Sequence, residues 1–202
     1  MAARLSEMLM SDALSRAKIA RAARRLNAGV LALMTDDVRL SDARVAANAL
    51  PPASLVIVRA CDAKIRAERA LALRPIARRR GLILLIADDS ALARAIGAHG
   101  VHLPEAKARR AARLRAQNPG FLITASAHSL RAALSIAHVD AIFLSPIFST
   151  QSHIGMAALT PARARLIARE LKTPLFALGG ITAQNASQLF GFSGLAAIGA
   201  LS

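Results

Sequence analysis

The chain has 202 residues, of which 54% are hydrophobic, and its formal net charge is +15. This length and apolar content suffice for one core, so we expect a single domain over residues 1–202. No uninterrupted apolar run reaches the roughly 18 residues of a membrane span. Cys61 is the only cysteine, which excludes an internal disulfide and a cysteine-based zinc site. We therefore expect a cytoplasmic protein with no membrane partner.

The positive charge raises the question of nucleic-acid binding, because dense basic surfaces attract polyanions. The arginines are scattered over nearly every helical segment, and the chain has six Phe, no Tyr and no Trp. Few aromatic rings are thus available for stacking on single-stranded bases. The pattern favours solvated arginines, or a general attraction of phosphorylated metabolites, over a nucleic-acid partner.

A basic, roughly amphipathic segment at residues 3–26 predicts a first helix. Short apolar runs without period-two alternation then recur, as is typical of parallel strands covered by helices on both faces. The expected strands are 30–34, 55–58, 82–87, 100–103, 121–125, 141–144, 175–178 and 195–198. The expected helices between them are 41–50, 62–80 with a break at Pro75, 90–98, 105–117, 129–138, 161–171 and 182–190.

This alternation predicts a (β/α)8 TIM barrel, with an open doubly wound sheet as the main alternative. Only residues 199–202 follow the last expected strand, so we expect the eighth helix to be missing. The extra N-terminal helix, or a partner subunit in a homodimer, would then cover that strand. The longest connection, residues 145–161, follows the sixth strand and marks the face where barrel enzymes build their sites.

Two small-residue turns follow the last two expected strands. Gly179 and Gly180 end the seventh strand, Thr182 can cap the next helix, and Ile198 and Gly199 end the eighth. Bare backbone N–H groups beside a helix start can hold a phosphate where side chains would block it. We interpret the turns as a phosphate cup, and the alternative is that the glycines merely end a strand.

Seven segments carry a family resemblance: LALMTDD (31–37), LLIADD (84–89), IGAHGVHL (96–103), SAHS (126–129), SPIFST (145–150), ALGGITAQN (177–185) and GLAAIG (194–199). In this ordered set the chain resembles the thiamine-phosphate synthase family, which includes the thiazole tautomerases. The resemblance implies a barrel that holds a thiazole phosphate in the cup of Gly179, Gly180, Ile198 and Gly199. In the synthases, magnesium then assists the loss of diphosphate from a phosphorylated pyrimidine.

The chain departs from the family at the groups that handle magnesium and diphosphate. Of the family's Gln-x-Arg-x-Lys after the second strand, only Arg59 remains. Asp88 matches one magnesium carboxylate, but Lys107 stands where the second acid is expected. Thr150 is retained, while His153 replaces a lysine. A magnesium cofactor is therefore expected only through Asp88, and Lys107 with Arg59 offers a direct cationic replacement.

His128 matches the histidine that the tautomerases use as acid and base, and an imidazole suits proton transfer near neutral pH. His102, Ser126, Thr150 and Arg59 are expected to contact the substrate. The alternative for His128 is a supporting hydrogen bond at the top of the barrel. We interpret the chain as a divergent family member that favours acid–base isomerisation; an active synthase (a transferase) and a non-catalytic phosphate-binding barrel remain open.

Overall fold

The computed structural model describes residues 30–37, 42–149, 158–182 and 184–197. Eight parallel strands follow one another in chain order around a closed barrel, and β1 pairs with β8 to complete the ring. The strands are β1 (Val30–Met34), β2 (Leu55–Val58), β3 (Ile83–Ala87), β4 (Gly100–Leu103), β5 (Leu122–Ala127), β6 (Ala141–Leu144), β7 (Leu175–Leu178) and β8 (Gly194–Ala197). The closure confirms the TIM barrel and excludes the open sheet.

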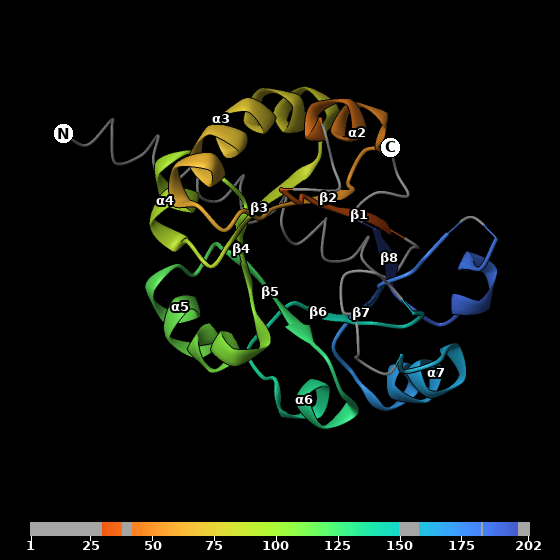
Figure 1. Ribbon diagram of the computed structural model, residues 1–202. Coiled ribbons are helices and arrows are strands. Elements are labelled where there is room, and N and C mark those ends of the chain that lie inside the picture. The colour runs from red at the N-terminus through yellow and green to blue at the C-terminus, as the bar shows by residue number, and fades with distance from the viewer. Residues whose placement is uncertain (1–29, 38–41, 150–157, 183, 198–202) are drawn as a thin grey trace.

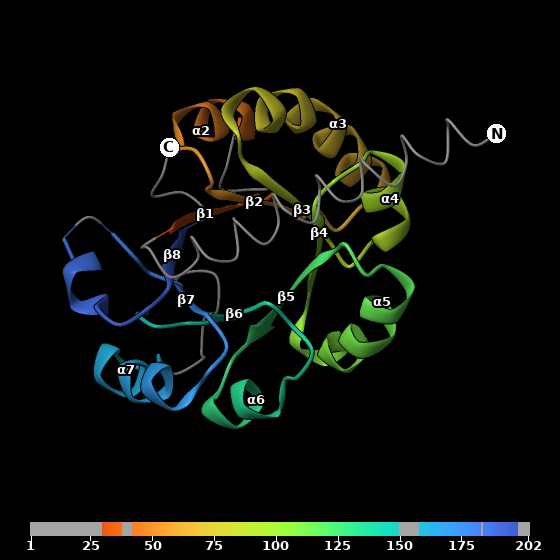
Figure 2. The same ribbon diagram turned by 180° about the vertical axis from the view of Figure 1, so that it is seen from behind.

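Helical segments surround the ring of strands on its outside (Figures 1 and 2). They are α2 (Ala43–Ala49), α3 (Ala63–Arg80), α4 (Ser90–Ala95), the 3-10 helix η1 (Glu105–Arg110), α5 (Ala111–Gln117), α6 (Leu130–Ser135), α7 (Pro161–Glu170) and the 3-10 helix η3 (Ala186–Leu189). No helix in this described part of the chain is long and apolar enough to cross a bilayer.

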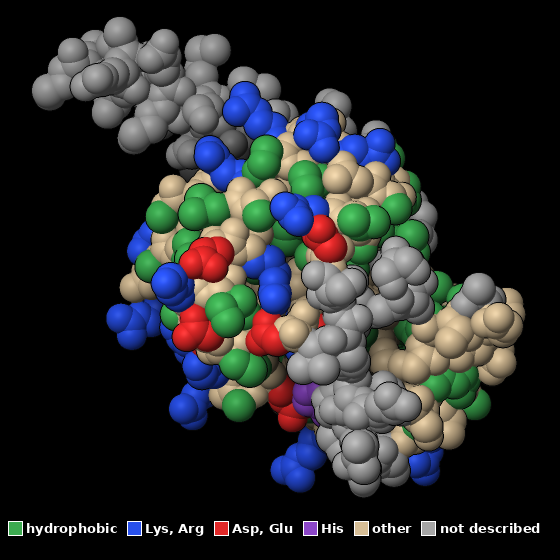
Figure 3. Space-filling model, turned by 45° about the horizontal axis from the view of Figure 1, so that its top comes forward, with side chains coloured by type: hydrophobic (Ala, Val, Ile, Leu, Met, Phe, Trp, Pro, Cys, Tyr) green, Lys and Arg blue, Asp and Glu red, His purple; other side chains and the backbone are tan. Residues whose placement is uncertain are grey.

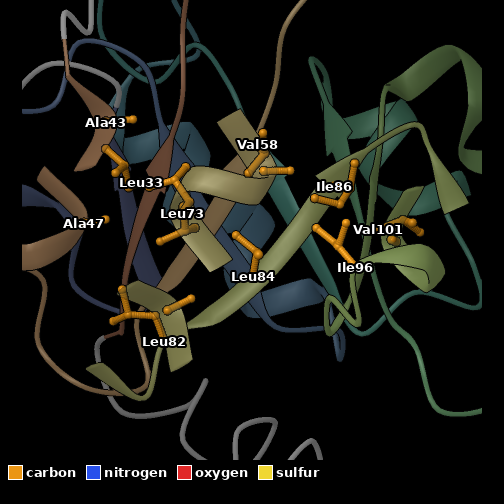
Figure 4. Packing of buried hydrophobic residues seen from close by; sticks show 14 of the residues in the cluster. Leu33, Ala43, Ala47, Val58, Leu73, Leu82, Leu84, Ile86, Ile96 and Val101 are labelled. Carbon is orange, nitrogen blue, oxygen red and sulfur yellow. The ribbon is translucent and has the colours of Figure 1, made fainter. Parts of the chain in front are cut away.

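Apolar side chains pack against both faces of the strands, inside the barrel and between the barrel and the helices. Inside, Phe143 stacks on Phe176 with ring centroids 4.8 Å apart, beside Met34 and Leu85. Outside, leucine, isoleucine, valine and alanine side chains pack between the strands and α2 to α5 (Figure 4). Burial of both faces explains why these strands are uniformly apolar in the sequence. Truncating such a buried leucine to alanine costs about 2–5 kcal/mol.

The helices after several strands start on short polar side chains. Asp62 accepts a hydrogen bond from Ile65 N at the start of α3, and Asp89 accepts one from Leu92 N at the start of α4. Ser129 does the same for Ala132 N at the start of α6. Each cap satisfies an N–H that the first helical turn leaves unpaired. The caps fix where the chain leaves the carboxyl end of the barrel.

Several expected helices differ from the structure. The expected helix 105–117 begins as the 3-10 helix η1, and the expected helices 90–98 and 129–138 end at Ala95 and Ser135. Helix α3 runs through Pro75 without a break. A proline removes one helical hydrogen bond, but the buried face formed by Ala70, Leu73, Ile76 and Ala77 holds both halves on the barrel.

The expected helix 182–190 is reduced to η3. Here Asn185 accepts from Thr182 N at 2.8 Å and donates to Gly180 O at 2.8 Å, so its side chain closes a turn where helix was expected. The expected cap by Thr182 is therefore wrong.

The cover of β8 stays a prediction. Its outward side chains, Leu195 and Ala197, are half-buried, whereas β2, β4, β6 and β7 are buried throughout. The expected N-terminal helix and the segment after Ala197 lie outside the described residues.

Candidate active site at the barrel mouth

The segments after the parallel strands meet at one end of the barrel, which we call the mouth. Acidic and basic side chains are intermingled on the face seen in Figure 3. The ion pairs at the ends of β1, β2 and β3 belong to this mouth: Arg59 with Asp36, Arg69 with Asp37, Arg66 with Asp89, and Lys107 and Arg110 with Asp88. Sites of TIM-barrel enzymes are built at this end.

Arg59 is tied to the end of β1. Its backbone N donates to Thr35 Oγ1 and its backbone O accepts from the same hydroxyl, each at 2.8 Å. Its guanidinium lies 2.8 Å from Asp36 Oδ2, and its side chain remains 42% exposed while that of Asp36 is 10% exposed. Arg59 is thus held at the mouth, and part of its side chain is exposed.

Asp37 completes the junction between β1 and α3. It accepts from Cys61 N at 3.1 Å and from Arg69 Nη1 at 2.8 Å. The hydrogen bond from the Cys61 N–H is the main cause that lowers the pKa of Asp37 below its ordinary value; burial opposes this shift, Arg69 adds to it, and Asp36 opposes it slightly. The geometry thus gives Asp37 a structural partner on each carboxylate oxygen.

Asp88 is the candidate magnesium ligand, and two cations hold it. Arg110 Nη1 lies 2.9 Å from Oδ1, and Lys107 Nζ donates to Oδ2. Asp88 has a left-handed backbone with φ of 53°, and its N–H donates to His102 O. A magnesium ion at Asp88 would have to displace both of these cations from the carboxylate. These residues do not fit a magnesium centre.

His102 is buried in the barrel under the mouth. Its Nδ1 lies 2.8 Å from Thr124 Oγ1, its Nε2 lies 2.8 Å from Ser126 Oγ, and Phe143 packs edge-on against the ring. Burial first, and then the positive charge of Arg59, lowers the pKa of His102 to about 3. The ring is therefore neutral at physiological pH, and it positions the half-buried Ser126 hydroxyl rather than facing the mouth itself.

His128 follows β5 and is half-buried. Its backbone N donates to Glu105 Oε2 at 2.5 Å. Its Nδ1 lies 3.0 Å from the carbonyl oxygen of Ser145 and 3.2 Å from Ser145 Oγ. Two neighbouring segments thus fix both the backbone and the ring of His128.

The glycines after β7 face the loop that follows β6. A Cβ on Gly179 would lie 2.9 Å from Pro146 Cα, and one on Gly180 would lie 2.5 Å from Ser149 O. Both glycines have positive φ, 97° and 65°. Phe148 N donates to Gly179 O, so the N–H of Gly180, on the other side of the same planar peptide, points away from that loop. Close packing of the chain explains the missing side chains, and the orientation of this N–H is compatible with an anion.

The other half of the expected cup, Ile198 and Gly199, lies outside the described residues. The same is true of Thr150 and His153. Their expected roles therefore stay predictions.

Sequence reasoning missed three contributors to the mouth: Arg110, Glu105 as the acceptor for His128, and Ser145. Arg110 could have been found from its spacing, because it lies three residues after Lys107 in one helical segment, where side chains share a face. The contacts of Glu105 and Ser145 join residues 23 and 17 positions apart, which no local pattern reveals.

Comparison with known proteins decides the family. The family model described as thiamine monophosphate synthase matches residues 31–201. The chain belongs to this family. Among curated members, the thiamine-phosphate synthase of Bordetella bronchiseptica is 36% identical over 138 residues, which cover 63% of either chain. That of Methanoculleus marisnigri is 38% identical over 147 residues, which cover 65% of either chain.

A solved structure with a related name has the same barrel fold. A thiamine phosphate pyrophosphorylase from Pyrococcus furiosus superposes with a TM-score of 0.68 at 23% identity, covering 86% of this chain and 87% of that one. Such a likeness supports the barrel alone. The chain spans slightly less than two thirds of the length of the curated relatives it matches. The resemblance seen in the sequence is confirmed at the level of the family.

Proposed function

We propose that the protein acts in thiamine biosynthesis, binds a phosphorylated thiazole at the mouth, and moves a proton on that ligand with His128. Family membership supports the pathway and the class of ligand. The observation that carries the proposal is the orientation of the His128 ring.

A backbone carbonyl only accepts hydrogen bonds, so the short contact with Ser145 O favours the proton on Nδ1 of the neutral ring. Nε2 is then the basic nitrogen. A positioned imidazole can take a proton from one position of a carboxythiazole phosphate and return it at another, with no net change in composition. Glu105 accepts a hydrogen bond from the backbone N of His128 and so fixes the position of this residue.

The phosphate of the ligand would bind at Gly179, Gly180, Ile198 and Gly199. The outward direction of the Gly180 N–H supports this placement, since a backbone N–H donates well to a phosphate oxygen. Ser126, which His102 positions, and Arg59 would contact the remainder of the ligand, as would Thr150. A second copy of the chain over β8 is part of the same proposal.

An isomerisation assay on carboxythiazole phosphate tests the role of His128. We expect turnover by the wild type and a decrease in kcat of about 10²- to 10⁴-fold in His128→Asn, with little change in ligand Kd. The matched control is His138→Asn, because His138 follows α6 at the opposite end of the barrel and asparagine tolerates its left-handed backbone. Equal turnover by His128→Asn and the wild type would contradict the proposal.

Coupling is the second candidate, favoured by the names of the curated relatives, which are thiamine-phosphate synthases. The same protein incubated with a thiazole phosphate, a pyrimidine methyl diphosphate and Mg²⁺ would then form thiamine phosphate. Coupling without isomerisation would replace the first proposal by the second. Stoichiometric ligand binding without either reaction would favour a non-catalytic binding protein.

A further inference from the structure

Among the described residues at the mouth, three carboxylates are paired with one arginine each, and one is shared by two cations. Asp36, Asp37 and Asp89 each pair with one arginine. Asp88 is shared by Lys107 and Arg110. Glu105 is directed to the backbone N of His128 instead. The group around Asp88 therefore carries one more positive than negative charge, and it attracts an anion rather than a metal cation.

The geometry of this group suits a ligand with several oxygens. Lys107 and Arg110 are three residues apart in a 3-10 helix, where side chains at this spacing lie on the same side. Each cation holds a different oxygen of Asp88. The two carboxylate oxygens therefore mark where two oxygens of an external anion would bind.

Asp88 is held weakly enough to be replaced. The side chains of Lys107 and Arg110 are 49% and 48% exposed, and that of Asp88 is 27% exposed. Ion pairs in such exposed positions contribute little, because water and salt screen them. A diphosphate offers more charge and more acceptor oxygens than one carboxylate, and arginine and lysine bind both kinds of group.

We propose that Lys107 and Arg110 form a metal-independent site for a diphosphate group, with Asp88 as the internal carboxylate that the ligand displaces. The site goes beyond the proposed function, because neither proton transfer at His128 nor a phosphate at Gly180 requires it. It also reverses the role of Asp88: a magnesium ligand helps to bind diphosphate, whereas an internal competitor opposes its binding.

Calorimetric titration with inorganic pyrophosphate in a buffer with EDTA tests this site. We expect the wild type to bind without metal, and Lys107→Met or Arg110→Gln to weaken binding about tenfold, as the loss of one charged contact does. Asp88→Asn should tighten binding about threefold. Asparagine tolerates a left-handed backbone as aspartate does, so this change preserves the turn.

Arg78→Gln is the matched control, because it removes the same charge from an exposed position near the carboxyl end of α3, away from the mouth. It should leave the pyrophosphate Kd unchanged. Thermal melts of each variant establish that it is folded. Binding that requires Mg²⁺ and is lost in Asp88→Asn would overturn the proposal, as would an absence of binding by the wild type. The titration contains no thiazole, so its outcome is independent of the assay for His128.

Discussion

At the scale of the residue, His102 shows how a polar group is accommodated inside the barrel. It remains neutral because its folded pKa is about 3, whereas the ordinary value is 6.5. Between these two values the unfolded chain binds more protons than the folded one, so stability decreases as pH falls below about 6.5. As far as His102 is concerned, the free energy of unfolding has its full value above that pH and keeps decreasing until the pH approaches 3.

We expect the free energy of unfolding of the wild type to fall by about 2 kcal/mol more between pH 7 and pH 5 than that of His102→Gln, because only the wild type must keep a buried imidazole neutral. Urea denaturation at the two pH values measures this difference. Parallel pH dependences in the two proteins would show that His102 is not the titrating group.

Gly180 gives a second prediction at this scale. Alanine there meets Ser149 O and adopts a left-handed backbone, so we expect Gly180→Ala to destabilise the protein by about 2–4 kcal/mol. Gly81 has nearly the same φ, 66°, but an added Cβ has nothing within 4 Å. Gly81→Ala should therefore cost only about 1 kcal/mol in urea denaturation. Equal losses in the two variants would refute the steric explanation.

At the scale of the element, the sequence predicted strands better than helices. The apolar runs of β1, β2, β4, β6 and β7 have the expected bounds, because burial on both faces leaves a continuous signal. Helix ends were less clear in an alanine- and arginine-rich sequence with few breaks. At Asn185, a side chain that bonds two backbone groups replaced the expected helix, and this turn chemistry competes with helical capping.

Pro75 supplies the test at this scale. It lies inside α3 with no N–H to donate to the carbonyl of Leu71, and tertiary packing alone keeps the helix continuous. We expect Pro75→Ala to raise the free energy of unfolding by about 1–2 kcal/mol, since the restored hydrogen bond exceeds the entropy gained by the unfolded chain. Arg74→Ala, at an exposed neighbouring position, should change it by less than about 0.5 kcal/mol. A loss of stability in Pro75→Ala would mean that α3 requires the proline geometry.

At the scale of the whole molecule, the barrel brings together residues that are far apart in the chain. The sequence located Asp88, Lys107 and His128 at strand ends, and parallel topology places all strand ends at one mouth. It could not show which cation pairs with which carboxylate, because that depends on side-chain directions across neighbouring strands. The arrangement places two cations around Asp88 and holds the His128 ring against Ser145.

The proposed function requires that this mouth binds a phosphorylated thiazole. Calorimetric titration of the wild type with thiazole phosphate, in a buffer containing EDTA, tests it most directly. We expect saturable binding of one ligand per chain, weakened in a double variant of Gly179→Ala and Gly180→Ala that still melts cooperatively. The absence of saturable binding by the folded wild type would contradict the claim.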